Sequence, residues 1–509
     1  MSRGRLGRTL PRTSRPPDDP LWYDLDHTKD ARHREEGERV GKRVTFHEGS
    51  GLVFMARNPA VLAFALMSLA VGCDDSGDRR ALSDAPTEED AATVGSCDWT
   101  FSAGGILADT AEAVLALPDG DVVVVGLVRT ANTPLGAAAG GFVTRLSSTG
   151  TVVWTNVFAD TEPLDIDVGH DGRLVVMGTA SSTASCAEFH GATDAWLAEV
   201  SPADGTLMRS ICIGGDDDDS ATAVRIGTNV NGRYYQITGT TDSHADGNIG
   251  PKHGGGGFDS PDVLYAYFYP DLPIGPANPR GVCFGSSGSE IGVGFLSDGT
   301  IVGNTFGADD GDLVGLPLDG ASDTLILKPS NFDACSVTTG GCTVSADRLG
   351  GNDIDSVLAM LPTGFVAGTT RSTSGQVFCA GEPVWLAKLD ATASAYVGQG
   401  CLSGGSTTLE DIAELGTSIA IVGTAGLAGD FTDAIRVGTS APGPGSLGYI
   451  GIYDASNFDA PEELVVMLDP KSVAFKGVAI RPDRCVVAVG AAFSPASSDA
   501  FVYTRRLPE

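Results

Sequence analysis

Residues 164–215 read LDIDVGHDGRLVVMGTASSTASCAEFHGATDAWLAEVSPADGTLMRSICIGG, and this stretch decides the fold. Alternating apolar and acidic residues open it, the pattern of a half-buried strand, and short runs rich in valine and leucine follow. Turn signals such as Asp171-Gly172 and Asp204-Gly205 separate these segments. The expected strands are 164–168, 174–178, 194–200 and 207–213. The stretch therefore predicts a unit of four short strands.

The second strand of this unit recurs along the chain, and every copy ends in a glycine. The closing glycines are Gly126, Gly178, Gly239, Gly303, Gly368, Gly423 and Gly490. They lie 52 to 67 residues apart, and the third strand also recurs seven times. A row of sandwich domains would need roughly 100 residues per repeat, which is too long for this period. We therefore expect an all-β, seven-bladed β-propeller of four-stranded blades over residues 97–509.

The two ends of the repeat array indicate how the ring closes. The last copy of the third strand, residues 499–504, is followed only by residues 505–509. The seventh blade therefore has no fourth strand of its own, whereas residues 98–102 form a spare strand ahead of the first unit. We expect this N-terminal strand to complete the last blade, because the pairing removes two exposed sheet edges.

The chain is strongly acidic from Asp74 onward, with 21 Lys and Arg against 56 Asp and Glu, a net charge of −35. Such a surface favours solubility and repels phosphate backbones. We therefore expect a monomer that does not bind nucleic acid.

The first 72 residues have the pattern of a leader. Residues 1–54 are polar and without periodicity, so they form either an extension or a segment that is not translated, with Met55 as the start. Residues 55–72 carry a basic start and an apolar run over 60–70 that is too short to span a membrane comfortably. The sequence LAVGC at 69–73 resembles a bacterial lipobox, which implies cleavage before Cys73 and its lipidation. The alternative is an ordinary signal peptide with an incidental cysteine.

Residues 73–96 are small, polar and acidic, which is typical of a flexible tether. Lipid on Cys73 would hold the folded part on a membrane. We expect the protein to be located in the cell envelope, at the outer membrane or cell surface. The alternative is the inner membrane, because Asp74 and Asp75 resemble an inner-membrane retention signal of some enterobacteria.

Nine cysteines besides Cys73 fit an exported protein with disulfides. Two pairs share one arrangement, in which the second cysteine lies 16 residues after a tryptophan. These pairs are Cys186 with Cys212 and Cys379 with Cys401. Cys335 and Cys342 are close enough to join one turn. Of the remaining Cys97, Cys283 and Cys485, a Cys97–Cys485 bond would lock the ring, and at least one thiol is left over.

Acidic residues recur after glycine pairs between the units. Asp109, Asp219 and Asp355 each lie four residues after the second glycine, and Glu410 lies five after it. They form either a ring of carboxylates for cations or a basic partner, or turns in which the acid accepts hydrogen bonds from loop amides. We expect no cofactor, with calcium as the alternative. Its candidate ligands are Asp216, Asp217, Asp218 and Asp219, together with Asp242 and Asp246 of a loop that resembles part of an EF-hand.

Glycine pairs, the Asp-Gly-Asn-Ile sequence at 246–249 and the Asp-Ala-Trp-Leu-Ala sequence at 194–198 resemble the β-propeller-repeat lipoproteins of environmental bacteria, myxobacteria especially. The resemblance implies the fold and says little about activity.

The sequence carries no hydrolase, zinc-protease or P-loop motif, and only four histidines follow Cys73. We therefore predict no catalytic residues. We expect a binding or scaffolding module for a protein or glycan ligand. The alternative is a hydrolase or lyase at the mouth of the central channel, using a bound cation.

Overall fold

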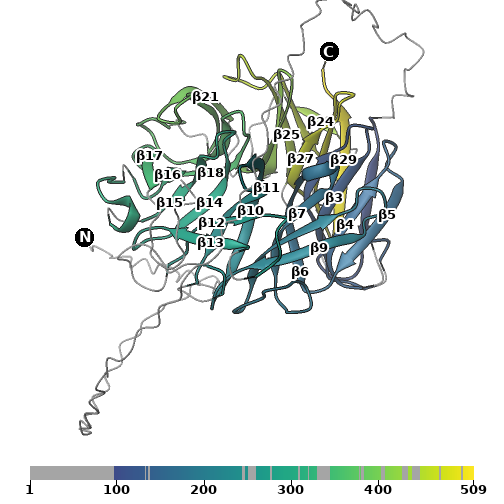
Figure 1. The fold of residues 1–509 in the computed structure, drawn as a ribbon. Helices are drawn as coiled ribbons and strands as arrows, with labels where there is room; N and C mark the ends of the chain where they lie inside the picture. The colour runs from purple at the N-terminus through teal and green to yellow at the C-terminus, as the bar shows by residue number, and fades with distance from the viewer. Residues whose placement is uncertain are drawn as a thin grey trace, which may run out of the picture. The chain divides into compact units, whose positions relative to one another are not determined.

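The computed structural model is all-β and consists of seven sheets arranged as blades of a ring, each with four antiparallel strands, which confirms the predicted seven-bladed propeller (Figure 1). It describes residues 97–508 except 132, 136–137, 244–246, 250–259, 276–277, 308–309, 319, 330–343, 378, 380–382, 403–406, 427–433, 438–446, 469–471 and 495–496. Within these residues, no helix has the length and apolar character needed to cross a membrane.

The strands of the first four blades are β2 (Thr110–Ala116), β3 (Val122–Val128), β4 (Gly140–Leu146) and β5 (Val152–Phe158); β6 (Thr161–Val168), β7 (Leu174–Ala180), β8 (Asp194–Val200) and β9 (Leu207–Ile213); β10 (Asp219–Asn229), β11 (Gly232–Thr241), β12 (Asp262–Phe268) and β13 (Arg280–Phe284); and β14 (Glu290–Phe295), β15 (Ile301–Thr305), β16 (Asp323–Pro329) and β17 (Val344–Leu349). Two 3₁₀ turns, η2 (His170–Gly172) and η3 (Gly311–Leu313), lie in connections.

The strands of the last three blades are β18 (Asp355–Met360), β19 (Phe365–Thr370), β20 (Val384–Leu389) and β21 (Tyr396–Leu402); β22 (Thr407–Leu415), β23 (Ser418–Ala425), β25 (Leu447–Asp454), β26 (Glu463–Met467) and β24 (Ile435–Val437); and β27 (Ser472–Ile480), β28 (Cys485–Phe493), β29 (Ser498–Arg506) and β1 (Thr100–Gly104). The sixth blade differs from the expectation of four strands, because β24 adds a fifth strand parallel to β26.

The ring closes through the N-terminal strand, as predicted. β1 pairs antiparallel with β29, with Thr100 opposite Tyr503, and completes the seventh blade. A disulfide between Cys97 and Cys485 ties the same two parts of the chain together. The strand lies two residues later than the expected 98–102. In Figure 1 the purple-blue first blade accordingly lies beside the yellow last blade.

The first strand of each blade is the innermost one, nearest the ring axis. It has a β-bulge near its start, and this bulge explains the recurring glycine. The bulged residues are Glu112, Leu164, Thr222, Val293, Leu358, Glu410 and Lys476. In each blade, the residue just before the bulge pairs with the closing glycine of the second strand. A Cβ added to any of these glycines would lie 1.9 to 2.1 Å from a backbone carbonyl oxygen of the innermost strand. Glycine is therefore required for close backbone approach.

The connections divide between two faces because each blade is an antiparallel meander. Links from the second to the third strand, and from one blade to the next, emerge on one side, which we call the loop face. The first-to-second and third-to-fourth links emerge on the other side, which we call the turn face. Loop-face links such as 181–193 are long, whereas turn-face links such as 117–121 are short. Sites built from loops therefore gather on the loop face.

Apolar side chains pack between neighbouring blades and form the core. Trp196 of the second blade packs with Val123 and Val143 of the first, and Met177 packs with Tyr235 of the third. Trp385 fills the equivalent place in the fifth blade, and both tryptophans are fully buried. The apolar runs of the second and third strands thus hold adjacent blades together, as expected for strands covered on both faces.

Candidate functional site

The central channel holds a cavity of about 460 Å³ to which all seven innermost strands contribute. The seven bulged residues all line it, because each bulge turns one extra side chain toward the ring axis. Leu164, Val293 and Leu358 make one part of the wall apolar. Glu112 and the ion pair of Lys476 with Glu410, whose Nζ and Oε2 atoms are 2.8 Å apart, make another part charged.

Acidic groups outnumber basic ones in this channel. The acidic lining residues are Glu112, Asp165, Asp167, Glu410 and Asp411, and the basic one is Lys476. Asp411 accepts hydrogen bonds from the backbone N–H groups of Ile412 (2.7 Å) and, from the next blade, Val478 (2.8 Å). Asp165 accepts one from its neighbour Ile166 (2.8 Å). The two aspartates occupy equivalent positions, one residue after the bulge.

The channel raises the pKa of both aspartates. Burial raises the pKa of Asp411 to about 7, with the nearby Glu410 adding to the rise and the Val478 and Ile412 amides opposing it. Burial and then the charge of Asp411 raise the pKa of Asp165 well above its ordinary value. Both side chains keep partial exposure to the channel, but the blades confine the water that reaches them. Each carboxyl is therefore costly to ionise without a cation beside it.

The acids after glycine pairs serve the inter-blade turns. Asp109, Asp219 and Asp355 accept hydrogen bonds from the backbone N–H groups of Gly105 (2.7 Å), Gly215 (2.8 Å) and Gly351 (2.5 Å), respectively. All three side chains are buried. This confirms the interpretation in which the acid satisfies loop amides. Glu410 differs, because it is a bulged residue and faces the channel.

The predicted calcium ligands differ in burial, and one of them lies outside the described residues. Asp219 is buried and also accepts a hydrogen bond from the Ser243 hydroxyl (2.8 Å), while Asp218 accepts one from the Thr193 hydroxyl (2.6 Å). Asp216 and Asp217 are exposed, Asp242 is half-buried, and Asp246 lies outside the described residues. Across the described part of the chain, no three His, Cys, Asp or Glu side chains are grouped to hold a metal. Calcium binding at this place stays a prediction.

The structure contains the disulfides Cys186–Cys212 and Cys379–Cys401, the two pairs that the spacing around the tryptophans predicts. Cys283 lies buried in β13. Cys335 and Cys342 lie outside the described residues, and so do Cys73, the leader and the tether, so those hypotheses stay as they were.

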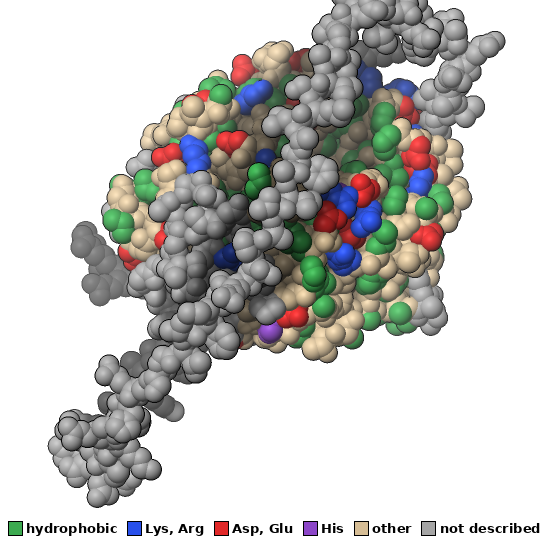
Figure 2. All heavy atoms as spheres, in the orientation of Figure 1, with side chains coloured by type: hydrophobic (Ala, Val, Ile, Leu, Met, Phe, Trp, Pro, Cys, Tyr) green, Lys and Arg blue, Asp and Glu red, His purple; other side chains and the backbone are tan. Residues whose placement is uncertain are grey.

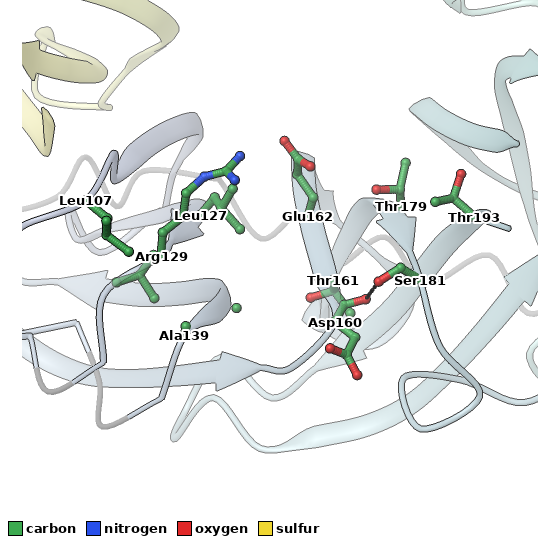
Figure 3. A pocket seen from close by; sticks show the side chains of 12 residues that line it. Leu107, Leu127, Arg129, Ala139, Asp160, Thr161, Glu162, Thr179, Ser181 and Thr193 are labelled. Carbon is green, nitrogen blue, oxygen red and sulfur yellow. Dashed lines mark hydrogen bonds between the residues drawn. The ribbon is translucent and has the colours of Figure 1, made fainter. Parts of the chain in front are cut away.

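A second recess, of about 510 Å³, lies on the loop face between the first and second blades (Figure 3). Arg129, just after β3, and Glu162 in β6 both extend into it. Hydroxyl groups of Thr161, Thr179 and Ser181 lie around them. Elsewhere on the surface, acidic and basic side chains gather beside one another (Figure 2). Turn-face examples include the ion pairs of Arg145 with Asp119 and Asp121.

No known protein family matches the sequence, and no curated protein is similar to it in sequence. Among solved structures, the chain is similar to Chaetomium thermophilum Raptor, at 11% identity over 80% of this chain with a TM-score of 0.39. It spans 28% of the length of that Raptor chain. It is also similar to Drosophila Plexin A in complex with Semaphorin 1b (10% identity, 81% of this chain and 88% of that chain, TM-score 0.39).

A third similar structure is Trypanosoma rangeli sialidase in complex with the inhibitor DANA (10% identity, 70% of this chain and 57% of that chain, TM-score 0.34). Likenesses this distant carry no argument about what this chain binds. The candidate sites therefore rest on the geometry of the channel and the loop face.

Proposed function

We propose that the protein is a binding module of the bacterial cell envelope, anchored by lipid on Cys73, that takes a positively charged group of its ligand into the central channel. The observation that carries the ligand chemistry is the excess of carboxylates in a cavity shared by all seven blades. Lys476, the one basic lining residue, is already paired with Glu410. An ammonium group would let Asp165 and Asp411 ionise together.

Affinity for such a group is expected to rise with pH. Because the pKa of Asp411 is about 7, its ionised fraction grows about tenfold between pH 6 and pH 8, and cation affinity should grow by about the same factor. The probe is 1,5-diaminopentane, titrated by calorimetry at both pH values. Asp411→Asn should remove both the binding and its pH dependence. Asp217→Asn, an exposed acid outside the channel lining, is the matched control.

Equal affinity at the two pH values, or binding that survives in the Asp411→Asn variant, would contradict the channel site. The stability of the ligand-free protein gives a second readout. Since the folded-state pKa values of Asp165 and Asp411 lie above 3.8, their contribution to stability is present below about pH 4 and is lost as the pH rises toward 7. Bound diamine should restore stability at pH 8.

One observation favours a second candidate, a hydrolase or lyase acting at the channel mouth. Three carboxyls with raised pKa values, those of Asp165, Asp167 and Asp411, line one cavity, and such groups suit general acid–base chemistry. The buried Asp219 is already used in a turn, so Asp411 and Asp165 are the residues to test. Turnover of glycan or lactone substrates that Asp411→Asn abolishes would favour the enzyme over the binding module.

The anchor is tested by intact-mass spectrometry of protein extracted from membranes of the native host. The expected chain starts at Cys73 and carries a mass excess of about three acyl groups. An unmodified chain that still contains residues 1–54 would rule out the anchor and leave the channel proposal standing.

A further inference from the structure

Each junction between neighbouring blades has two equivalent positions on the loop face. The first position belongs to the earlier blade and lies two residues before the third-strand residue that pairs with the closing glycine. The second belongs to the next blade and lies two residues before the first-strand residue that pairs with the closing glycine there. At four junctions both positions are acidic: Asp194 with Asp219, Asp262 with Glu290, Asp323 with Asp355, and Asp499 with Asp109. At the other three neither is: Gly140 with Thr161, Pro383 with Thr407, and Leu447 with Val473.

Where the acid pair is present, its carboxylates lie against the glycine that follows the fourth strand. A Cβ added to Gly214 would lie 2.2 Å from Oδ1 of Asp194 and 2.9 Å from Oδ2 of Asp219. Gly285 has the same relation to Asp262 and Glu290, with distances of 2.0 and 2.8 Å.

At two of the three junctions that lack the acid pair, the structure holds a recess. The junction with Gly140 and Thr161 holds the recess of about 510 Å³ shown in Figure 3. The junction with Pro383 and Thr407 holds one of about 490 Å³. At both of these junctions, uncharged residues stand where four other junctions carry acids.

Both recesses also contain an arginine at the same register position. Arg129 and Arg371 each lie three residues after a closing glycine, and each lines its recess. In the other five blades this position is Ser181, Asp242, Phe306, Gly426 and Phe493. The arginine thus occurs at the two junctions that hold a recess and at none of the four that carry the acid pair. A guanidinium presents a planar set of donors that matches a carboxylate.

The opposite wall distinguishes the two recesses. Glu162 of β6 faces the first recess, and Thr408 holds the equivalent place in the second. Among the described residues, neither the Arg129 guanidinium nor the Glu162 carboxylate has an ion-pair or hydrogen-bond partner. Their nitrogen and oxygen atoms are also more than 4.0 Å from each other. By contrast, the carboxylate of the nearby Asp160 is bonded to the Ser182 hydroxyl (2.8 Å).

We propose that the recess between the first and second blades binds a small zwitterionic ligand, whose carboxylate pairs with Arg129 and whose ammonium group pairs with Glu162. The ligand class is that of amino acids and short peptides. A doubly charged phosphate would meet Glu162 at close range and is disfavoured there. This site is separate from the central channel, so either can exist without the other.

The test uses a series of amino acids whose two charges lie at increasing separation: glycine, β-alanine, 4-aminobutyrate and 6-aminohexanoate. Binding to the full-length protein is measured by calorimetry, with affinities expected near the millimolar range because the two pairs are partly exposed. One length should bind best, since the distance between Arg129 and Glu162 is set by the blades. The N-acetyl and amide derivatives, which each lack one charge, should bind at least about tenfold more weakly.

Two variants and one control locate the site. Arg129→Gln should weaken binding of the best zwitterion about tenfold or more, and Glu162→Gln should remove the preference for it over its N-acetyl derivative. Arg371→Gln changes the equivalent arginine of the recess that lacks a glutamate and should leave the affinity within about twofold. Overturning results are no binding by any probe, equal binding of the N-acetyl derivative to the unmodified protein, or loss of binding in Arg371→Gln alone.

Discussion

Gly239→Ala should abolish stable folding or lower the free energy of unfolding by more than about 4 kcal/mol. The added Cβ would lie 1.9 Å from the carbonyl oxygen of Ser220 and 3.0 Å from the Cα of Ala221, at the bulge of the third blade. Both neighbours are backbone atoms, so relief requires moving the innermost strand. Urea unfolding followed by circular dichroism measures the change.

Gly275→Ala is the matched control, because among the described residues beyond its chain neighbours no heavy atom would lie within 4 Å of the added methyl group. It should shift the unfolding free energy by less than about 1 kcal/mol. Gly368→Ala repeats the test in the fifth blade, where the added Cβ would lie 1.9 Å from the carbonyl oxygen of Ser356. If Gly239→Ala and Gly368→Ala unfold like the control, the bulges are adaptable and do not explain the repeated glycine.

Replacing Cys97 and Cys485 together by alanine should destabilise the protein by about 5 kcal/mol, the second large effect. The disulfide closes a segment of 388 residues, whereas Cys186–Cys212 closes 26. In the chain-entropy account this difference makes the ring-closing disulfide stronger by about 2 kcal/mol. β1 has only five residues, so the disulfide reinforces a short strand pairing that completes the last blade.

The matched control is the Cys186→Ala, Cys212→Ala double variant, expected to lose about 3 kcal/mol. Both variants and the unmodified protein are unfolded with urea, with and without reductant. Reductant should bring the unmodified protein to the stability of the variants or below it. Equal losses in the two variants under oxidising conditions would show that ring closure does not depend on the long-range disulfide.

The fold was predictable from the sequence because the bulge of each blade requires a glycine in the strand that pairs with it. A closing glycine is visible in every repeat, and valine-rich runs mark the strands around it. The extra strand β24 was not predictable, since only three residues form it and they pair out of order with β26.

The channel residues were not predictable for a geometric reason. The bulged residue precedes its closing glycine by 10 to 17 positions, depending on the length of the turn, so it cannot be aligned without the strand pairing. From the sequence alone, Asp165 was therefore interpreted as part of a strand of alternating apolar and acidic residues, and Glu410 as an acid of an inter-blade turn. The recess at Arg129 did leave a signal, because Gly140 and Thr161 break the acidic pattern of other junctions.

The closure of the ring also fixes the face of the propeller at which Cys97 lies. β1 is a fourth strand and runs from the turn face to the loop face, so Cys97, just before it, lies at the turn face. Leu507, just after β29, donates a backbone hydrogen bond to Arg484 at that same face (2.9 Å). A tether joined at Cys97 would draw the turn face toward its support and leave the loop face, with its recesses, pointing outward. Labels or supports attached beside Cys97 should therefore leave those recesses open to ligands.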